Sequence, residues 1–382
     1  MAKRPGWHNW RLPTHGNGMT QVDESLVRGR LRDVLDPHTG APLGDAIRAI
    51  GVDGARVSVD LQLGYPAAGA IDALQAQAQQ ALEADPAIER AAVSLTSRIQ
   101  SHKVQGALAP LANVKNILVV ASGKGGVGKS TVAANLALAL QAEGARVGVL
   151  DADIYGPSQP RMLGISGKPQ SPDGKSIIAM TAHGLQAMSI GFLVDQDTPM
   201  IWRGPMVTQA MMQLLNDTRW EMLDYLVIDL PPGTGDIQLT LSQKVPVAGA
   251  IIVTTPQDIA LLDARKALKM FEKVEVPVLG IVENMSTHVC SNCGHEEHIF
   301  GAGGGEAMAE QYAVPFLGSL PLDIRIREQA DSGTPTVAAM PDSDLAARYR
   351  SIARNAAGRL SRQPRNKSLG LGKIVVQNAP SA

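Results

Sequence analysis

The residues with the clearest chemical signature form a glycine-rich segment near the middle of the 382-residue chain. The segment follows the apolar run 116–121 and precedes the alanine- and leucine-rich stretch 130–142, so it joins a predicted buried strand to a predicted helix. Glycines there let backbone N–H groups surround phosphates, and the helix N-terminus adds a favourable dipole. The G-x-x-x-x-G-K-[ST] pattern therefore predicts a nucleotide-binding loop. Its expected binding residues are Gly123, Lys124, Gly125, Gly126, Val127, Gly128, Lys129, Ser130 and Thr131.

Two lysines in this loop have different expected roles. Lys129 is placed to reach the β- and γ-phosphates, and the neighbouring Ser130 hydroxyl to ligate Mg²⁺. Lys124 has no place in the ordinary phosphate cradle and resembles the extra lysine of the deviant Walker A loop in the MinD/ParA/nitrogenase-iron-protein class of ATPases. The resemblance implies that Lys124 crosses a two-fold interface and contacts the partner's nucleotide, as an arginine finger does. Hydrolysis would then depend on a homodimer.

Acidic residues after two further predicted strands complete the expected ATPase site. Asp151 and Asp153 follow strand 147–150, and Asp229 ends the apolar strand 225–228. Doubly wound sheets bind ligands at the carboxyl ends of their strands, where these three carboxylates would meet. Asp229 is expected to hold Mg²⁺ through a water. By resemblance Asp153 positions the attacking water, whereas Asp151 is the weaker candidate and chiefly structural.

Two more residues are candidates for nucleotide contacts. Gly233 lies in a Pro-Pro-Gly-Thr-Gly turn that resembles switch II, where its amide would sense the γ-phosphate. Asn284 follows strand 278–282 and is placed to hydrogen-bond an adenine edge, or else only to cap or turn the chain. The sequence contains no N-K-x-D guanine motif, so ATP is the expected nucleotide. The expected catalytic residues of this ATP hydrolase are Lys124, Lys129, Asp153 and Asp229.

Both cysteines of the chain, Cys290 and Cys293, lie in one C-x-x-C segment. Two thiolates on a short loop are half of the ligand set that a tetrahedral or cubane site requires. A two-fold dimer would bring four thiolates together, enough for one [4Fe-4S] cluster. Inert thiols, a thiol–disulfide pair and structural zinc remain as alternatives. The zinc alternative would use histidines of the same segment, at a spacing compact for a zinc finger: His288, His295 and His298.

Taken together, several segments of the chain resemble the Mrp/ApbC family of iron–sulfur cluster carrier ATPases. They are GKGGVGKST, DADIYGPS, DLPPGTGD, GIVENMS and the C-x-x-C, within about residues 116–340. The resemblance implies a [4Fe-4S] cluster held between subunits, received from an upstream scaffold and passed to apoproteins under the control of ATP. The competing class is a ParA/MinD-like positioning switch that binds DNA or membrane. A net charge of -1 and the lack of an amphipathic C-terminal helix disfavour it.

The remaining sequence predicts the elements that position these residues. In 116–360, buried strands alternate with helices, which predicts an α/β P-loop NTPase domain with a mostly parallel, doubly wound sheet. Residues 23–99 predict a small α/β domain that resembles, more weakly, a cluster-assembly domain without its cysteine. Its expected elements are helices 24–35 and 71–83 and strands 57–63 and 92–95. The other expected parts are a disordered extension 1–22, a linker 100–115 and a flexible tail 361–382.

Composition narrows the expected partners and location. Aromatic residues make up only 3% of the chain and the net charge is near zero, so we expect no nucleic-acid partner. No apolar run approaches the length that spans a bilayer, and the first residues lack a signal-peptide pattern, so we expect no membrane partner. Two cysteines form no disulfide framework, which predicts a reducing, cytoplasmic environment.

Overall fold

A computed structural model describes residues 22–193, 204–290 and 292–366. The described chain forms two compact units. The first comprises residues 22–35, 42–61 and 73–95, and the second contains the remaining described residues. The predicted extension before residue 22 and the predicted tail beyond residue 366 lie outside the described residues.

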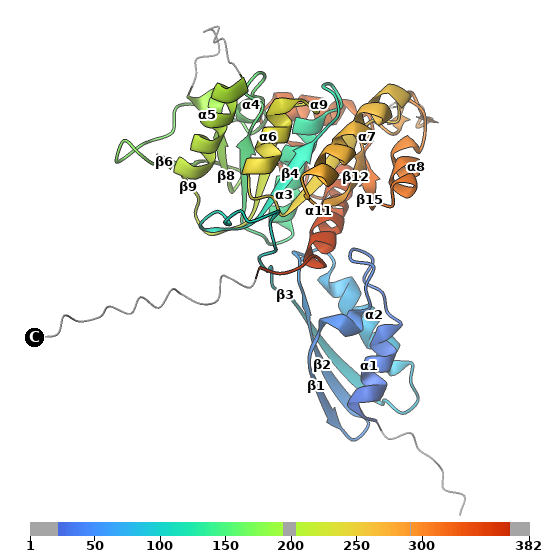
Figure 1. The fold of residues 1–382 in the computed structure, drawn as a ribbon. Coiled ribbons are helices and arrows are strands. Elements are labelled where there is room, and N and C mark those ends of the chain that lie inside the picture. Colours follow the sequence, from blue (N-terminus) through green and yellow to red (C-terminus); the bar gives the residue numbers. More distant parts are fainter. Residues whose placement is uncertain (1–21, 194–203, 291, 367–382) are drawn as a thin grey trace, which may run out of the picture. The chain divides into compact units, whose positions relative to one another are not determined.

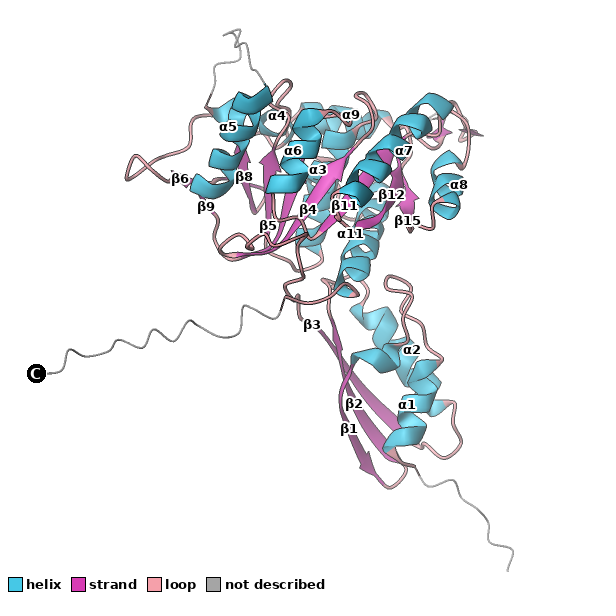
Figure 2. Cartoon of the chain, in the orientation of Figure 1, coloured by secondary structure: helices cyan, strands magenta, loops and turns pink. Residues whose placement is uncertain are grey.

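The first unit is built on a three-stranded sheet in the order β1-β2-β3, and helices lie along one side of it (Figure 2). Exposed and buried residues alternate along β2 and β3, so one face of each strand packs against the helices. The predicted strand 57–63 and helix 71–83 are observed, but β1 was not predicted because most of its residues are exposed and it lacks a clear alternation. The elements are α1 (Glu24–Arg32), η1 (Leu43–Ala46), β1 (Ile47–Asp53), β2 (Arg56–Leu63), α2 (Ile71–Glu83) and β3 (Arg90–Ser97).

The second unit contains a sheet of eight strands within the described residues, in the order β15-β12-β11-β4-β10-β5-β8-β7. Every neighbouring pair is parallel except β7 and β8, at one edge. The predicted mostly parallel α/β sheet is therefore confirmed. Its strands are β4 (Val114–Ala121), β5 (Val147–Asp151), β7 (Met180–Ala182), β8 (Leu185–Ser189), β10 (Leu223–Asp229), β11 (Gly249–Thr254), β12 (Val278–Glu283) and β15 (Phe316–Ser319).

Helices cover both faces of this sheet (Figure 1). Helices α3 and α11 pack against each other on one face, whereas α5, α6 and α7 lie on the other. Strand β10 is buried along its whole length, as expected of a parallel strand covered on both sides. The helices are α3 (Lys129–Ala142), α4 (Gln159–Met162), α5 (Gly204–Asp217), α6 (Asp236–Lys244), α7 (Asp258–Lys273), α8 (Gly304–Gln311), α9 (Ile324–Asp331), α10 (Thr336–Ala339) and α11 (Asp344–Ser361). Short elements complete the unit: β6 (Ile177–Ile178), η2 (Ile190–Phe192), β9 (Thr218–Arg219), β13 (His288–Val289) and β14 (Glu296–Glu297).

The residues predicted as a linker, 100–115, belong to the second unit and are hydrogen-bonded to the rest of it. The buried Gln105 side chain donates to the carbonyls of Ser242 and Val245, at 2.7 and 2.6 Å, where α6 ends. Its side-chain oxygen also accepts from the Val247 N–H at 2.9 Å, so both the nitrogen and the oxygen of this buried amide have partners. The domain boundaries stay predictions.

The segment predicted as a tail begins within regular structure. Helix α11 ends at Ser361, one residue inside the predicted tail. Beyond it, the Pro364 carbonyl accepts from the Lys103 N–H at 2.8 Å. The described part of this segment therefore pairs with the start of the predicted linker.

No helix among the described residues is both long and apolar enough to cross a bilayer.

Candidate functional site

The glycine-rich loop connects β4 to α3 at the carboxyl end of a central strand. Gly126 and Gly128 have φ angles of 83° and 80°, in the left-handed region that favours glycine. A Cβ on Gly126 would meet no atom within 4 Å, so the loop is open there. On Gly123 a Cβ would lie 2.1 Å from the Asp263 backbone, so only glycine lets α7 pack this closely. An open loop of glycines before a helix N-terminus fits a phosphate group.

The loop lysine lies against the predicted magnesium carboxylate. Lys129 Nζ is paired with Asp229 Oδ1, and it also donates to Ser130 Oγ at 3.3 Å. Both charged side chains are buried, with exposed fractions of 6% and 0%. A buried ion pair persists only because each charge neutralises the other. A phosphate bound by Lys129 would compete with Asp229 for the same ammonium group.

Asp151 organises the loop that contains Asp153. Its buried carboxylate accepts from the Asp153 N–H at 3.2 Å, the Gln159 N–H at 3.0 Å and the Ser189 hydroxyl at 3.2 Å. Burial, together with the nearby charge of Asp229, raises the pKa of Asp151 to about 7. Asp153 is half-buried, and its burial raises the pKa of its carboxyl as well. The water-positioning role of Asp153 stays a prediction.

Gln159 is a site residue that the sequence motifs did not reveal. It begins α4 and is 1% exposed. Its Nε2 lies 3.0 Å from both the Ser130 carbonyl oxygen and Asp229 Oδ2. Glutamine is usually exposed, so a lone Gln after DADIYGPS gave little reason to expect it here. Its proximity to that segment was the only signal.

Two residues that were predicted to contact the nucleotide are hydrogen-bonded at the glycine-rich loop. The Gly233 N–H donates to the Ser122 carbonyl at 2.9 Å, so sensing a phosphate would exchange this bond. Asn284 Nδ2 donates to the Val127 carbonyl at 2.9 Å, so Asn284 packs directly against the glycine-rich loop. The γ-phosphate and adenine contacts both stay predictions.

The two cysteines lie on a small antiparallel hairpin made by β13 and β14. The Cys290 N–H donates to the His295 carbonyl, and the Gly294 N–H donates to the Cys290 carbonyl, both at 2.9 Å. Cys290 is half-buried and Cys293 is exposed. Hydrogen bonds from the backbone N–H groups of Asn292 and Cys293 lower the pKa of the Cys290 thiol. The hairpin therefore presents a thiol that ionises readily, as a metal ligand must.

The neighbouring histidines do not complete a zinc site within the described residues. His288 Nδ1 lies 3.0 Å from the Leu322 carbonyl oxygen, and His298 Nδ1 lies 3.1 Å from the Ser286 carbonyl oxygen. In the described part of the chain, no group of three or more His, Cys, Asp or Glu side chains is placed to hold a metal ion. Within the residues that the structure describes, the two thiols therefore lack the further ligands that the zinc alternative needs.

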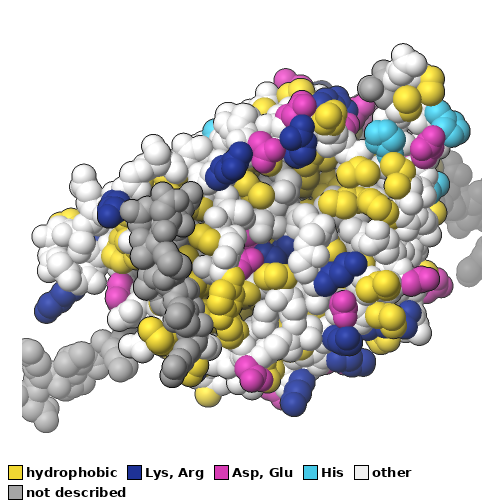
Figure 3. Space-filling model, turned by 90° about the horizontal axis from the view of Figure 1, so that it is seen from above, with side chains coloured by type: hydrophobic (Ala, Val, Ile, Leu, Met, Phe, Trp, Pro, Cys, Tyr) yellow, Lys and Arg dark blue, Asp and Glu magenta, His cyan; other side chains and the backbone are white. Residues whose placement is uncertain are grey.

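Large apolar side chains are exposed on α7 and beside the cysteines. The exposed fractions are 68% for Ile259, 53% for Leu262, and 51% for both Val289 and Ile299. The space-filling view from above shows hydrophobic side chains gathered next to histidines (Figure 3). We call Ile259, Leu262, Val289 and Ile299 the apolar surface. Exposed apolar patches are typical of interaction sites.

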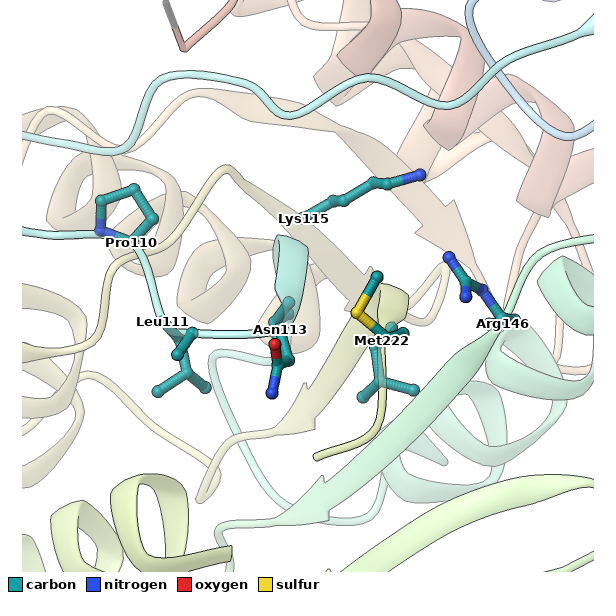
Figure 4. A pocket seen from close by; sticks show the side chains of 9 residues that line it. Pro110, Leu111, Asn113, Lys115, Arg146 and Met222 are labelled. Atoms are coloured by element: carbon teal, nitrogen blue, oxygen red, sulfur yellow. The ribbon is translucent and has the colours of Figure 1, made fainter. Parts of the chain in front are cut away.

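A pocket of about 290 Å³ lies at the opposite end of the central strands, where β4 and β10 begin (Figure 4). Lys115 Nζ donates to Asp224 Oδ1 at 2.7 Å, and Arg146 Nε lies 3.4 Å from Asp224 Oδ2. Both cations therefore share one carboxylate. Figure 4 shows Met222 between Asn113 and Arg146, and Leu111 beside Pro110. None of the predicted site residues lines this pocket.

Comparison with known proteins agrees with this geometry. The family model described as NUBPL iron-transfer P-loop NTPase matches residues 113–357, and the model of an iron–sulfur cluster assembly protein matches residues 24–95. The glycine-rich loop, the parallel sheet and these matches define a P-loop NTPase. The chain belongs to the NUBPL iron-transfer P-loop NTPase family.

Individual relatives support the same placement. An iron–sulfur cluster carrier protein of Pseudomonas fragi is 62% identical over 268 residues, which is 70% of this chain and 93% of the relative. The mouse iron–sulfur cluster transfer protein NUBPL is 50% identical over 257 residues, covering 67% of this chain and 81% of its own. The solved nucleotide-binding protein of Archaeoglobus fulgidus, in complex with ADP, is 37% identical with a TM-score of 0.54, covering 61% and 91%. The predicted family and fold class are thereby confirmed.

Proposed function

We propose that the protein is an ATP-hydrolysing carrier that holds one [4Fe-4S] cluster across a homodimer and transfers it to apoproteins. The observation that carries this proposal is the exposed hairpin with two thiols and no third protein ligand among the described residues. A cubane cluster takes four thiolates, and a two-fold axis would supply them from two copies. Relatives named as cluster carriers or transfer proteins support the cargo.

The apolar surface supports a second copy of the chain as the partner. Ile259, on α7, is 68% exposed, and Val289, adjacent to Cys290, is 51% exposed. Burying such side chains against a symmetric copy would remove apolar area from water where the cysteines need to meet. The cluster would then lie at the edge of an interface, within reach of recipient apoproteins. The reducing cytoplasm stays the predicted location.

The nucleotide site supplies the proposed hydrolysis. Bound Mg²⁺ would neutralise charge on the phosphates, with Ser130 as ligand and Asp229 holding it through a water. Lys129 binds the β- and γ-phosphates, Asp153 orients the attacking water, and Lys124 of the second copy stabilises the charge that develops. Gly233 and Asn284 are proposed to contact the γ-phosphate and the adenine. The relative with bound ADP supports an adenine nucleotide as ligand.

A short path connects the two sites within one chain. Asn284 contacts the glycine-rich loop through Val127, and it directly follows β12. Six residues further along, Cys290 begins the C-x-x-C segment, and between them the Ser286 N–H donates to the Leu320 carbonyl at 3.0 Å. A loop that closes on ATP would thus move the start of the cysteine hairpin, and with it the separation of the two thiol pairs.

The proposal is tested by cluster transfer under three nucleotide conditions. The protein is reconstituted anaerobically with iron and sulfide, and release of the cluster to an apo-ferredoxin is followed by visible absorption with ATP, with ADP and without nucleotide. We expect the release rate with ATP to differ from the other two. Equal rates in all three conditions would refute the coupling of ATP to transfer.

A further inference from the structure

Gln159 connects three parts of the nucleotide site through a single side chain. Its Nε2 donates both hydrogens, one to the Ser130 carbonyl and one to Asp229 Oδ2, each at 3.0 Å. The opposite orientation of the amide would place its oxygen against two acceptors, so the partners fix which atom is the nitrogen. The backbone N–H of Gln159 donates to Asp151 Oδ2 at 3.0 Å, which holds the residue in place.

These contacts fix the orientation of the Asp229 carboxylate. Oδ1 is paired with Lys129 Nζ, which also contacts Ser130 Oγ, and Oδ2 is bound by Gln159. The two oxygens therefore have different partners: Oδ1 lies beside Lys129, which also contacts the predicted magnesium ligand Ser130, and Oδ2 accepts from Gln159. When Lys129 turns to a phosphate, Gln159 is the remaining side chain in the described residues that is hydrogen-bonded to Asp229.

The amide oxygen of Gln159, in contrast to the nitrogen, accepts no hydrogen bond from the described residues. Gln159 Oε1 is buried and has no hydrogen-bond partner within the described part of the chain. A buried acceptor without a donor is unfavourable, and native structures seldom contain one. A water held by Mg²⁺ is a strong donor that would satisfy it.

We propose that Gln159 is a positioning residue for Mg²⁺, which holds Asp229 through its amide nitrogen and accepts from a magnesium-bound water through its amide oxygen. The inference rests on the proposed Mg²⁺–ATP site. Because Gln159 follows the loop of Asp153, it also connects that loop to the Walker B carboxylate. Loss of its side chain weakens the response of nucleotide binding to Mg²⁺ and leaves metal-free nucleotide binding intact.

The test is the affinity for ADP of wild type and Gln159→Leu, measured calorimetrically with Mg²⁺ and with EDTA. In EDTA we expect the two proteins to agree within about twofold. With Mg²⁺ we expect the variant to bind ADP about tenfold more weakly, because a hydrogen bond to a charged group is lost. The matched control is Gln105→Leu, which removes a buried glutamine that donates to two carbonyls where α6 ends. It should respond to Mg²⁺ as wild type does.

A double variant separates positioning from a general structural role. If Gln159 acts through Asp229, Gln159→Leu will add little to the magnesium defect of Asp229→Asn. If the magnesium defects of the two single variants multiply in the double variant, the inference is contradicted. It is also contradicted if Gln159→Leu loses the same ADP affinity in EDTA as in Mg²⁺. If wild type binds ADP no better with Mg²⁺, the proposed magnesium site fails together with the inference. If wild type responds to Mg²⁺ and Gln159→Leu responds equally, the inference alone fails.

Discussion

The nucleotide site and the cysteine hairpin differ in how much of each site one chain supplies. At the nucleotide site, Lys129, Asp229 and Gln159 are almost fully buried, and Asp229 accepts hydrogen bonds from the other two. At the hairpin, strands of two residues present a half-buried Cys290 and an exposed Cys293. Packing therefore fixes the side chains of the nucleotide site before any ligand binds. The two cysteines of one hairpin are half of the ligand set that the proposed cluster requires. The difference predicts that ligand binding at one site can be removed by substitution while the other site still binds its own ligand.

The largest expected effect is loss of the cluster without loss of nucleotide binding. Cys290→Ala removes one of two thiols per chain, so we expect the reconstituted protein to lose its [4Fe-4S] cluster while its ADP affinity stays within about twofold of wild type. Iron and labile sulfide analysis with visible absorption measures the cluster content, and calorimetry measures the ADP affinity. His295→Ala, at an exposed histidine of the same hairpin, should keep the cluster. A cluster that survives in Cys290→Ala would contradict the proposed ligands.

Lys124 tests whether the nucleotide site is also shared between copies. If it acts as an arginine finger acts, Lys124→Ala lowers the turnover of ATP about 1,000-fold and leaves ADP affinity within a few-fold of wild type. Lys273→Ala, at an exposed lysine in the last turn of α7, is the control. Mixing Lys124→Ala with Asp153→Ala should restore part of the activity, since one composite site regains both groups. No recovery in the mixture would argue for action within one chain.

The apolar surface provides the next test. Ile259→Glu would place a charge in the proposed dimer interface, where desolvation without a partner costs enough to weaken association about a hundredfold. Sedimentation velocity with ATP measures the dimer. Met222→Glu is the matched control, because Met222 is 56% exposed but lines the pocket at the opposite end of the sheet. Equal weakening by the two variants would show that Ile259 does not mark the interface.

The smallest effect concerns pH. The pKa of Asp151 is raised from 3.8 to about 7, so folding favours its protonated form. The stabilisation that Asp151 provides through its raised pKa is fully present below the unfolded-state pKa of 3.8. It is lost as the pH rises through the folded-state pKa of about 7. Between pH 5 and 7, the unfolding free energy of wild type should fall relative to Asp151→Asn by up to about 1 kcal/mol per pH unit. Urea unfolding measures this, and a constant difference would contradict the raised pKa.

Much of the fold and of the nucleotide site was predictable from local patterns. The glycine-rich loop, the apolar strands and the acid that ends β10 each depend on a few adjacent residues, so a short sequence motif is enough to predict them. Strand β1 was missed because its exposed residues show no period-2 pattern. Strand β7 was not predicted either. It has only three residues, too few to show a pattern, and it is held by its antiparallel pairing with β8.

Contacts between distant residues were not predictable in this way. Gln159 meets Asp229 across 70 positions, and Gln105 meets Val245 across 140. Neither glutamine belongs to a motif, and burial of an amide becomes visible only once the partners are placed in space. The pairing of Lys129 with Asp229 is similar, since each residue was predicted but their direct contact was not.

The central claim, one cluster shared by two chains, is tested most directly by native mass spectrometry of the anaerobically reconstituted protein. The account predicts a species of two chains with four iron and four sulfide ions, which is lost when either cysteine is replaced. A single chain that carries a complete cluster would contradict it. So would a chain that carries one zinc ion and no sulfide.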